Sequence, residues 1–288
     1  MWVEFLHGFL FLIIELTALF VLISFLIIFL QAVVPFEKIV QKMEGKNKLM
    51  ASFIAVFFAF LTPFCSCSTI PIVVNMLKKK LPFGIVMVFL FASPVLDPTI
   101  LTIMGVILGW KVTIIYVIIT SLLSIIIGLS LEALGFEKSV KKVVMKNDKE
   151  VSNSFNLKEA WKETWALIRE VFPFLLLGSA IGAGIHNLVP TEWMVNVLGE
   201  DKWWLVPLAA LVGIPLYIRL SSMIPISQVL IMKGMALGSV MALLISSAGA
   251  SLPEIILLKS IFKKELVITF VLSVFTMASI SGFIFYLI

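Results

Sequence analysis

The sequence predicts an all-α polytopic membrane protein built from two inverted repeats. Three observations support this prediction: the composition is strongly apolar, eight apolar segments alternate with short loops, and prolines and glycines repeat between the two halves of the chain. Of the 288 residues, 61% are hydrophobic and only 14% are charged, and the mean hydropathy is +1.13. A soluble domain needs about 25% charged residues to cover its surface, so the composition excludes a soluble enzyme and a nucleic-acid-binding domain.

Each apolar segment is long enough to cross about 30 Å of hydrocarbon or to fold back within it. The segments are residues 8–33, 49–77, 83–108, 112–133, 171–189, 203–232, 235–258 and 266–288. No stretch between them has room for a soluble catalytic domain, so we expect the lipid bilayer to be the main partner of the chain.

The repeat is clearest around two short polar segments. Ser68-Thr-Ile-Pro71 aligns with Ser222-Met-Ile-Pro225, and Gly84 and Ser93 then align with Gly238 and Ser247 without a gap. Shared prolines and glycines in the same order are harder to obtain by chance than shared apolar residues. The repeat predicts two transmembrane units, residues 1–135 and 160–288, joined by a charged linker, residues 136–159.

The positions of the lysines indicate how the two units are related. If every apolar segment crossed the membrane, the two sides would carry 9 and 11 lysines. If residues 49–77 and 203–232 each enter and return on one side, the split becomes 17 to 3. Short cytoplasmic loops are rich in lysine, so the second topology is favoured. Each unit then has three crossings and one re-entrant hairpin, which makes the repeats inverted, and we expect a multi-pass inner (plasma) membrane protein with a cytoplasmic linker.

Inverted repeats with broken segments are typical of secondary transporters, and the breaks indicate where the binding site lies. We expect no regular helix over Thr62–Pro71, because Pro71 lacks a backbone donor and Thr62 precedes a proline. Irregular backbone at membrane depth must be buried in protein or line a cavity, so we predict a hairpin tip at a permeation site. Ser66, Ser68 and Thr69 would line it and satisfy freed backbone groups. The alternative is a proline kink in an ordinary span.

Cys65 and Cys67 lie within this segment, and a turn there would bring their sulfur atoms together. Two thiolates suit a soft ion or compound, such as Cu(I), Zn(II) or trivalent arsenic. The alternative is that both are small, inert, buried residues.

Two charged residues within the apolar segments are candidates for the site. Arg219 aligns with Cys65 in the repeat and could hold an anion or pair with an acid, whereas Asp97 lies at a second break between Pro94 and Pro98. Charges inside a membrane are costly and are associated with transport. Asp97 is therefore a candidate for proton relay or cation binding, and the region aligned with it carries Glu254. A structural ion pair is the alternative for Arg219.

The segment Thr62-Pro-Phe-Cys-Ser-Cys-Ser-Thr-Ile-Pro71, followed by Phe91-Ala-Ser-Pro-Val-Leu-Asp-Pro98, resembles the ArsP/YraQ-type predicted permease family. The resemblance covers most of the chain and implies a permease with eight hydrophobic segments. The best understood members export trivalent organoarsenicals, and a membrane cysteine recognises the arsenic. The resemblance therefore implies that Cys65 and Cys67 face the arsenic.

We therefore expect a secondary permease, not an enzyme, that exports a small thiophilic solute such as a trivalent organoarsenical. Cys65 and Cys67 would bind the solute, while Asp97 and Arg219 would supply coupling charge or gate the cavity. No nucleotide-binding motif is present, so we expect the energy for transport to come from a coupling ion or a partner. We also expect no cofactor. The alternatives are a permease for a sulfur-containing anion or a metal ion, and a non-transporting membrane scaffold. The sequence leaves the oligomeric state open.

Overall fold

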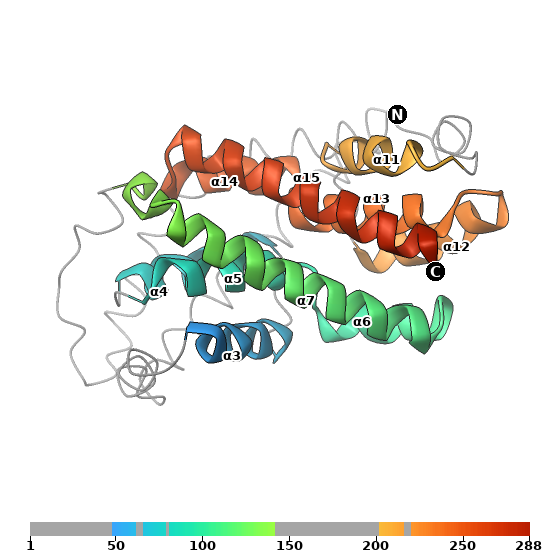
Figure 1. Cartoon of the computed structure of the whole chain (residues 1–288), viewed down its shortest axis with the longest axis horizontal. Helices are drawn as coiled ribbons and strands as arrows, with labels where there is room; N and C mark the ends of the chain where they lie inside the picture. The colour runs from blue at the N-terminus through green and yellow to red at the C-terminus, as the bar shows by residue number, and fades with distance from the viewer. Residues whose placement is uncertain (1–47, 62–65, 79–80, 142–201, 216–219) are drawn as a thin grey trace, which may run out of the picture.

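The computed structural model describes residues 48–61, 66–78, 81–141, 202–215 and 220–288 (Figure 1). Within them the chain is helical apart from short turns and a single antiparallel β-bridge between Val140 and Phe262. The helices are α3 (Lys48–Leu61), α4 (Ser66–Lys78), α5 (Phe83–Ala92), α6 (Pro98–Ile107), α7 (Trp110–Ala133), the 3-10 helix η1 (Phe136–Ser139), α11 (Leu205–Gly213), α12 (Leu220–Met232), α13 (Leu237–Gly249), α14 (Leu252–Ile261) and α15 (Lys264–Leu287). The expected segments 8–33 and 171–189, and most of the linker, lie outside the described residues.

Among the described residues, two helices, α7 and α15, are each long and apolar enough to cross a membrane. Each has 24 residues, which corresponds to about 36 Å of helix. On α7, Trp110, Ile114, Ile118 and Leu122 expose large apolar side chains at every fourth position. In a bilayer such a stripe faces lipid rather than water. A third candidate span is the pair formed by α13 and α14, which is bent by 43°. These features define a helical membrane protein.

Breaks occur in more segments than the two that the sequence predicted to be re-entrant, and one of them is the further break expected between Pro94 and Pro98. Of the six expected segments that the structure describes, four are divided into two helices each. Residues 83–108 form α5 and α6, which are separated at Ser93–Asp97 because Pro94 and Pro98 both interrupt the helical hydrogen bonds. Residues 235–258 are divided in the same way, since α13 ends at Gly249 and α14 starts again with Pro253 in its first turn.

Helix boundaries recur at a constant distance along the chain. The ends of α6, Pro98 and Ile107, lie 154 residues before Leu252 and Ile261, the ends of α14. The same shift relates α7 to α15 at both ends, and α5 to α13 at their first residues. It is also the shift that aligns Pro71 with Pro225 in the sequence.

The corresponding long helices α7 and α15 are antiparallel. Val140, which follows α7, forms its bridge with Phe262, which precedes α15. Near the middle of both helices the Ser124 hydroxyl donates to the Met277 sulfur at 3.9 Å. Residue numbers therefore rise along α15 as they fall along α7, and Figure 1 shows the two helices crossing the molecule in opposite directions.

Close helix packing depends on pairs of glycines. A Cβ atom on Gly128 of α7 would lie 2.8 Å from the Val88 nitrogen and 2.9 Å from the Gly84 oxygen, both on α5. A Cβ atom on Gly282 of α15 would lie 2.8 Å from the Gly238 oxygen on α13. Glycine at these positions lets the two helix backbones approach closely, as in other membrane proteins.

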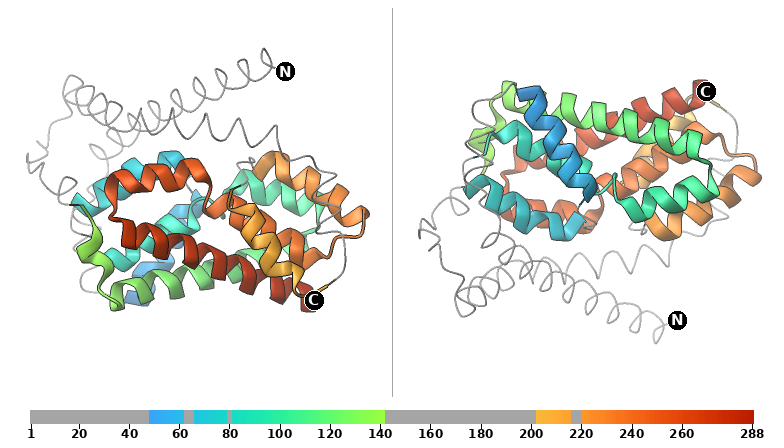
Figure 2. Two further views of the ribbon diagram at one scale, coloured as in Figure 1. Left: turned by 90° about the horizontal axis from the view of Figure 1, so that it is seen from above. Right: turned by 90° about the horizontal axis from the view of Figure 1, so that it is seen from below.

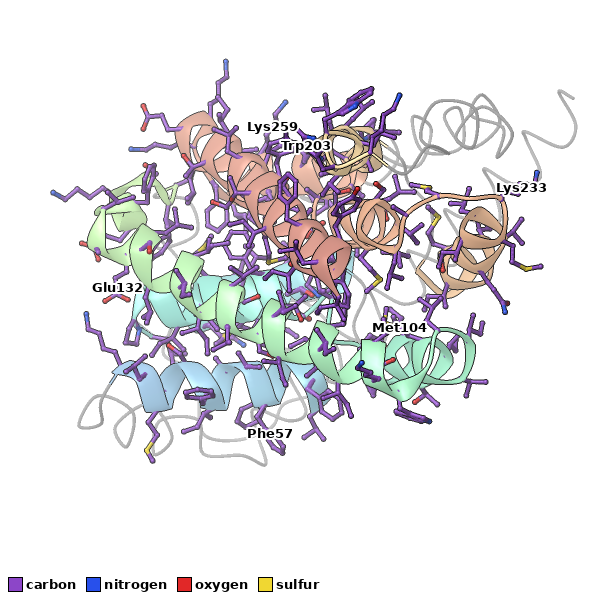
Figure 3. The ribbon with its side chains drawn as sticks, turned by 45° about the vertical axis from the view of Figure 1, so that its right-hand side comes forward. Phe57, Met104, Glu132, Trp203, Lys233 and Lys259 are labelled. Carbon is purple, nitrogen blue, oxygen red and sulfur yellow. The ribbon has the colours of Figure 1, made fainter. Side chains whose placement is uncertain are left out.

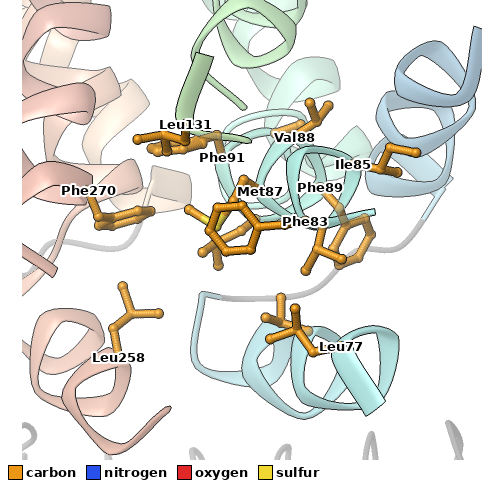
Figure 4. Close-up of a cluster of buried hydrophobic side chains, with 14 of the residues drawn as sticks. Leu77, Phe83, Ile85, Met87, Val88, Phe89, Phe91, Leu131, Leu258 and Phe270 are labelled. Atoms are coloured by element: carbon orange, nitrogen blue, oxygen red, sulfur yellow. The ribbon is translucent and has the colours of Figure 1, made fainter. Parts of the chain in front are cut away.

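The apolar core consists of two clusters, and each takes helices from both halves of the chain. α5 is buried on all sides, with Phe91 stacked on Phe270 of α15 at a ring-centroid distance of 4.9 Å (Figure 4). The first cluster surrounds α5 and includes α4 and α14, whereas the second surrounds α13 and includes α12 and α6. The packing is thus reciprocal, because α6 packs on α12 while α14 packs on α4 (Figure 2).

Several loops meet at the end of the bundle where α7 ends and α15 begins. The Glu132 carboxylate accepts hydrogen bonds from the Lys48 ammonium and from the Gly84 backbone nitrogen, each at 2.7 Å. This contact places the starts of α3 and α5 beside the end of α7. We refer to this region as the lysine-rich end; its described lysines are Lys48, Lys78, Lys138, Lys141, Lys259, Lys263 and Lys264. Lys111, Lys202 and Lys233 lie at the opposite end, and Figure 3 shows Glu132 and Lys233 far apart.

We expect Glu132→Ala to lower the stability of the purified protein by about 1–2 kcal/mol, the usual effect of losing a helix N-cap. The reason is that α5 has no capping side chain of its own, so Glu132 supplies the acceptor at its first turn. Thermal unfolding in detergent measures the effect. Lys48→Gln is the matched control, because the Lys48 side chain is 69% exposed and a surface ion pair adds little. Equal losses in the two variants would contradict the capping role.

Candidate functional site

The predicted site lies where a short helical hairpin reaches the middle of the bundle. α3 starts at the lysine-rich end and α4 returns to it, and their 14 and 13 residues make each helix about 20 Å long. The described part of each helix is shorter than a crossing of the bilayer. Residues 62–65 lie outside the described residues. The geometry of α3 and α4 fits a re-entrant hairpin better than a full crossing.

Thr69 links this hairpin to the break between α5 and α6. The Thr69 hydroxyl oxygen lies 3.2 Å from the Ser93 hydroxyl, and both side chains are fully buried. Ser93 directly follows α5, so the first turns of α4 lie at the depth of the second break. The sequence predicted that Thr69 would satisfy freed backbone groups, and the structure shows the Ser93 hydroxyl as one partner of its hydroxyl group.

A second hairpin has the corresponding arrangement at the other end of the molecule. α11 and α12 are its two helices, and Lys202 and Lys233 flank them. The last residue of α11, Gly213, lies against Ser246 near the end of α13, where a Cβ atom would overlap the serine hydroxyl. We use the term central layer for the depth of the breaks at Ser93–Asp97 and Ala250–Ser251. Both hairpins therefore extend from opposite ends toward the central layer.

The expectation that Thr62–Pro71 forms no regular helix was wrong for most of this segment. Ser66 to Pro71 belong to α4, and Pro71 is its sixth residue. Proline at this position removes one hydrogen bond, to the carbonyl of Cys67. Membrane helices tolerate this loss where neighbouring helices and hydroxyl side chains cover the freed groups. Pro225 occupies the same sixth position in α12.

Asp97 has a clear structural role in addition to its predicted functional one. It directly precedes α6, and its carboxylate accepts a hydrogen bond from the Ile100 nitrogen at 3.3 Å, as an N-cap residue does. The helix shift aligns Asp97 with Ser251, the N-cap of α14, and Glu254 lies three residues farther along the aligned region. Asp97 is partly exposed, so it borders the break without being enclosed by it.

Two residues at the central layer were missed as site candidates by sequence reasoning. The Tyr116 hydroxyl on α7 donates to the Val95 carbonyl at 3.1 Å, which ties the long helix to the α5–α6 break. Glu254, in the first turn of α14, is fully buried together with both its carboxylate oxygens. An acid within an apolar segment was the available signal for Glu254, whereas nothing in the sequence distinguishes Tyr116.

The remaining predicted residues cannot be placed around this geometry. Cys65 and Arg219 lie outside the described residues, as do the side chains of Ser66, Cys67 and Ser68 within α4. The described part of the chain contains no group of three or more His, Cys, Asp or Glu side chains arranged to hold a metal ion. Contact between Asp97 and Arg219 stays a prediction, and so does the thiol pair.

Apolar spans, short hairpins and breaks at the middle of the bundle together define a polytopic membrane protein with the architecture of a transporter. The chain belongs to the ArsP_1 family, described as predicted permease, which matches residues 1–287. This match confirms the resemblance noted in the sequence.

Two relatives agree with the family assignment. The chain is similar to the UPF0718 protein MJ0584 of Methanocaldococcus jannaschii, with 22% identity over 86% of each chain. It is also similar to the UPF0718 protein YraQ of Escherichia coli, with 23% identity over 81% of this chain and 66% of that protein. No solved structure matches the chain.

Proposed function

We propose that this permease is a secondary transporter that exports a small thiophilic solute, a trivalent organoarsenical, by alternating access. The observation that carries the proposal is the pair of hairpins, which extend from opposite ends toward the central layer, with Cys67 in the first turn of α4. Permease family membership supports transport, and the two-thiol segment supports a soft solute.

Inverted repeats are part of this proposal. Three observations support them: the constant 154-residue shift between helices, the antiparallel directions of α7 and α15, and the reciprocal packing of α6 on α12 and α14 on α4. A reciprocal contact of this kind is what a two-fold axis produces. In alternating access the two repeats move against each other around a fixed site.

Within the proposed site, Cys65 and Cys67 bind the arsenic while Ser66, Ser68 and Thr69 line the path. Thr69 would act through its contact with Ser93, which connects the hairpin to the α5–α6 break. Asp97 and Arg219 would supply charge for gating or coupling. The proposed location is the plasma membrane, with the lysine-rich end in the cytoplasm.

The test is export from intact cells. Cells that lack their own arsenical exporters are made to produce this chain, and retained arsenic is measured after loading with methylarsenite. We expect less retained arsenic and greater resistance than in cells carrying an empty vector. Equal retention, with the protein present in the membrane, would reject the arsenical. The same assay with thiosulfate or copper would then examine the other solutes.

The re-entrant topology has its own test by cysteine accessibility. In a chain whose native cysteines are replaced by serine, single cysteines at Lys42 and Lys79 should react with a membrane-impermeant reagent from the same face. A cysteine at Lys233 should react from the other face. Reaction of Lys42 and Lys79 from opposite faces would show that residues 49–77 cross the membrane.

A further inference from the structure

Glu254 is distinguished by complete burial within an apolar helix. Its relative exposure is 0%, and both carboxylate oxygens are inaccessible. The neighbouring side chains on α14 are apolar, including fully buried Leu257 and Leu258. A buried carboxylate is costly unless a proton, a cation or hydrogen bonds compensate its charge. Such residues inside membranes mark ion pathways and proton relays.

The position of Glu254 puts it at the central layer beside the predicted substrate hairpin. α14 begins at Leu252, at the break, and ends at Ile261, beside the lysine-rich end. α4 also begins near the break, as the Thr69–Ser93 contact shows, and returns to the lysine-rich end. The two helices pack on each other and run in the same direction. The first turn of α14, with Glu254, therefore lies at the depth of the first turn of α4, with Cys67.

Helix capping does not account for this acid. Ser251 and Glu254 have the spacing of a capping box, but the Ser251 side chain makes no capping hydrogen bond. The corresponding helix α6 has Ile100 in place of Glu254. Its first turn is capped by Asp97. The first half therefore forms the corresponding helix without an acid at this position. This indicates that Glu254 in the second half is needed for a reason other than capping.

Five other titratable residues lie on or near α14 in the described part of the chain. They are Cys67 and Lys78 of α4, Lys264 and Glu265 of α15, and Lys259 of α14 itself. Cys67 shares the depth of Glu254, whereas the charged residues lie farther from the break. The four charged side chains are exposed, and all lie toward the lysine-rich end. The described parts of α5 and α13 carry no titratable side chain.

We propose that Glu254 is the proton-binding group that couples solute export to the proton gradient. The proposal rests on the permease function proposed above. The carboxylate takes up one proton from the outer side and releases it to the cytoplasm, so that only an O–H bond forms and breaks. Binding of the proton and passage of the solute are linked because Glu254 and the first turn of α4 lie at the same depth, in the central layer.

The test compares two transport modes in proteoliposomes of the purified chain, with methylarsenite as the probe. One mode is accumulation driven by an imposed pH gradient, and the other is exchange of internal for external solute without a gradient. We expect Glu254→Gln to lose the first mode and keep the second, and Glu254→Asp to keep both. Glu265→Gln, an exposed acid on α15, is the control and should keep both. Gradient-driven accumulation by Glu254→Gln at the wild-type rate would overturn the proposal.

A second readout does not depend on the solute. Dicyclohexylcarbodiimide modifies protonated carboxyl groups in apolar surroundings, and mass spectrometry locates the adduct. In the wild-type chain we expect an adduct on Glu254 that forms in acidic buffer and diminishes as the buffer becomes alkaline. No adduct at any pH, or one that does not depend on pH, would overturn the proposal even if Glu254→Gln failed to fold. Absence of methylarsenite flux in the wild-type chain, with a pH-dependent adduct, would reject the arsenical and retain the proton site.

Discussion

Cells that produce the Cys65→Ser/Cys67→Ser variant should be as sensitive to methylarsenite as cells without the transporter. Trivalent arsenic binds thiolates far better than hydroxyl groups, and the chain has no cysteines other than these two. Serine keeps a similar size, so helix α4 should still form. Retained arsenic after loading is the measurement, as for the wild-type chain.

Single substitutions and a second solute sharpen this experiment. If both sulfur atoms bind one arsenic atom, Cys65→Ser and Cys67→Ser should each lose most of the export. Ser68→Ala is the control within the same segment and should retain most of it. Full resistance in the double variant, at wild-type membrane abundance, would exclude a thiol role and direct attention to anionic solutes and Arg219.

Gly128→Leu should prevent the chain from reaching a stable folded state. The leucine side chain would have to enter the space held by backbone atoms of Val88 and Gly84, which cannot move away as a side chain can. Overpacking costs about 1–3 kcal/mol where side chains can adjust, and we expect at least the upper end of that range here. Gel-filtration profiles and thermal unfolding of detergent extracts measure the result.

The corresponding glycine in the other half provides an internal comparison. Gly282→Leu should be about as damaging, because a Cβ atom there already lies 2.8 Å from both the Gly238 oxygen and the Ala242 side chain. Ser130→Leu is the control, since Ser130 is an exposed residue only two positions from Gly128 on α7. A folded Gly128→Leu protein would show that α5 and α7 separate easily.

Much of the architecture follows from sequence signals with simple physical causes. The long helices α7 and α15 agree closely with the apolar segments 112–133 and 266–288, because continuous apolar length is the strongest signal of a membrane helix. The spacing that aligns Pro71 with Pro225 also relates the helix boundaries, since prolines and glycines limit where helices can begin and end.

Other features depend on contacts that no local pattern records. Pro71 was expected to end regular structure, yet it belongs to α4. The contact between Thr69 and Ser93 joins residues 24 positions apart, and the bond from Tyr116 to Val95 joins α7 to the break between α5 and α6. Asp97 and Glu254 are both acids within apolar segments, but Asp97 caps a helix and Glu254 is enclosed.

The exchange of α6 and α14 between the halves has a consequence for biosynthesis. As the chain leaves the ribosome, the flank of α4 that α14 covers stays open until synthesis has passed Ile261. The first half therefore enters the membrane before α14, the helix that completes its packing, has been made. Insertion factors and membrane proteases would encounter the first half before α14 covers α4. Synthesis of the final helices therefore completes the folding of the whole transporter.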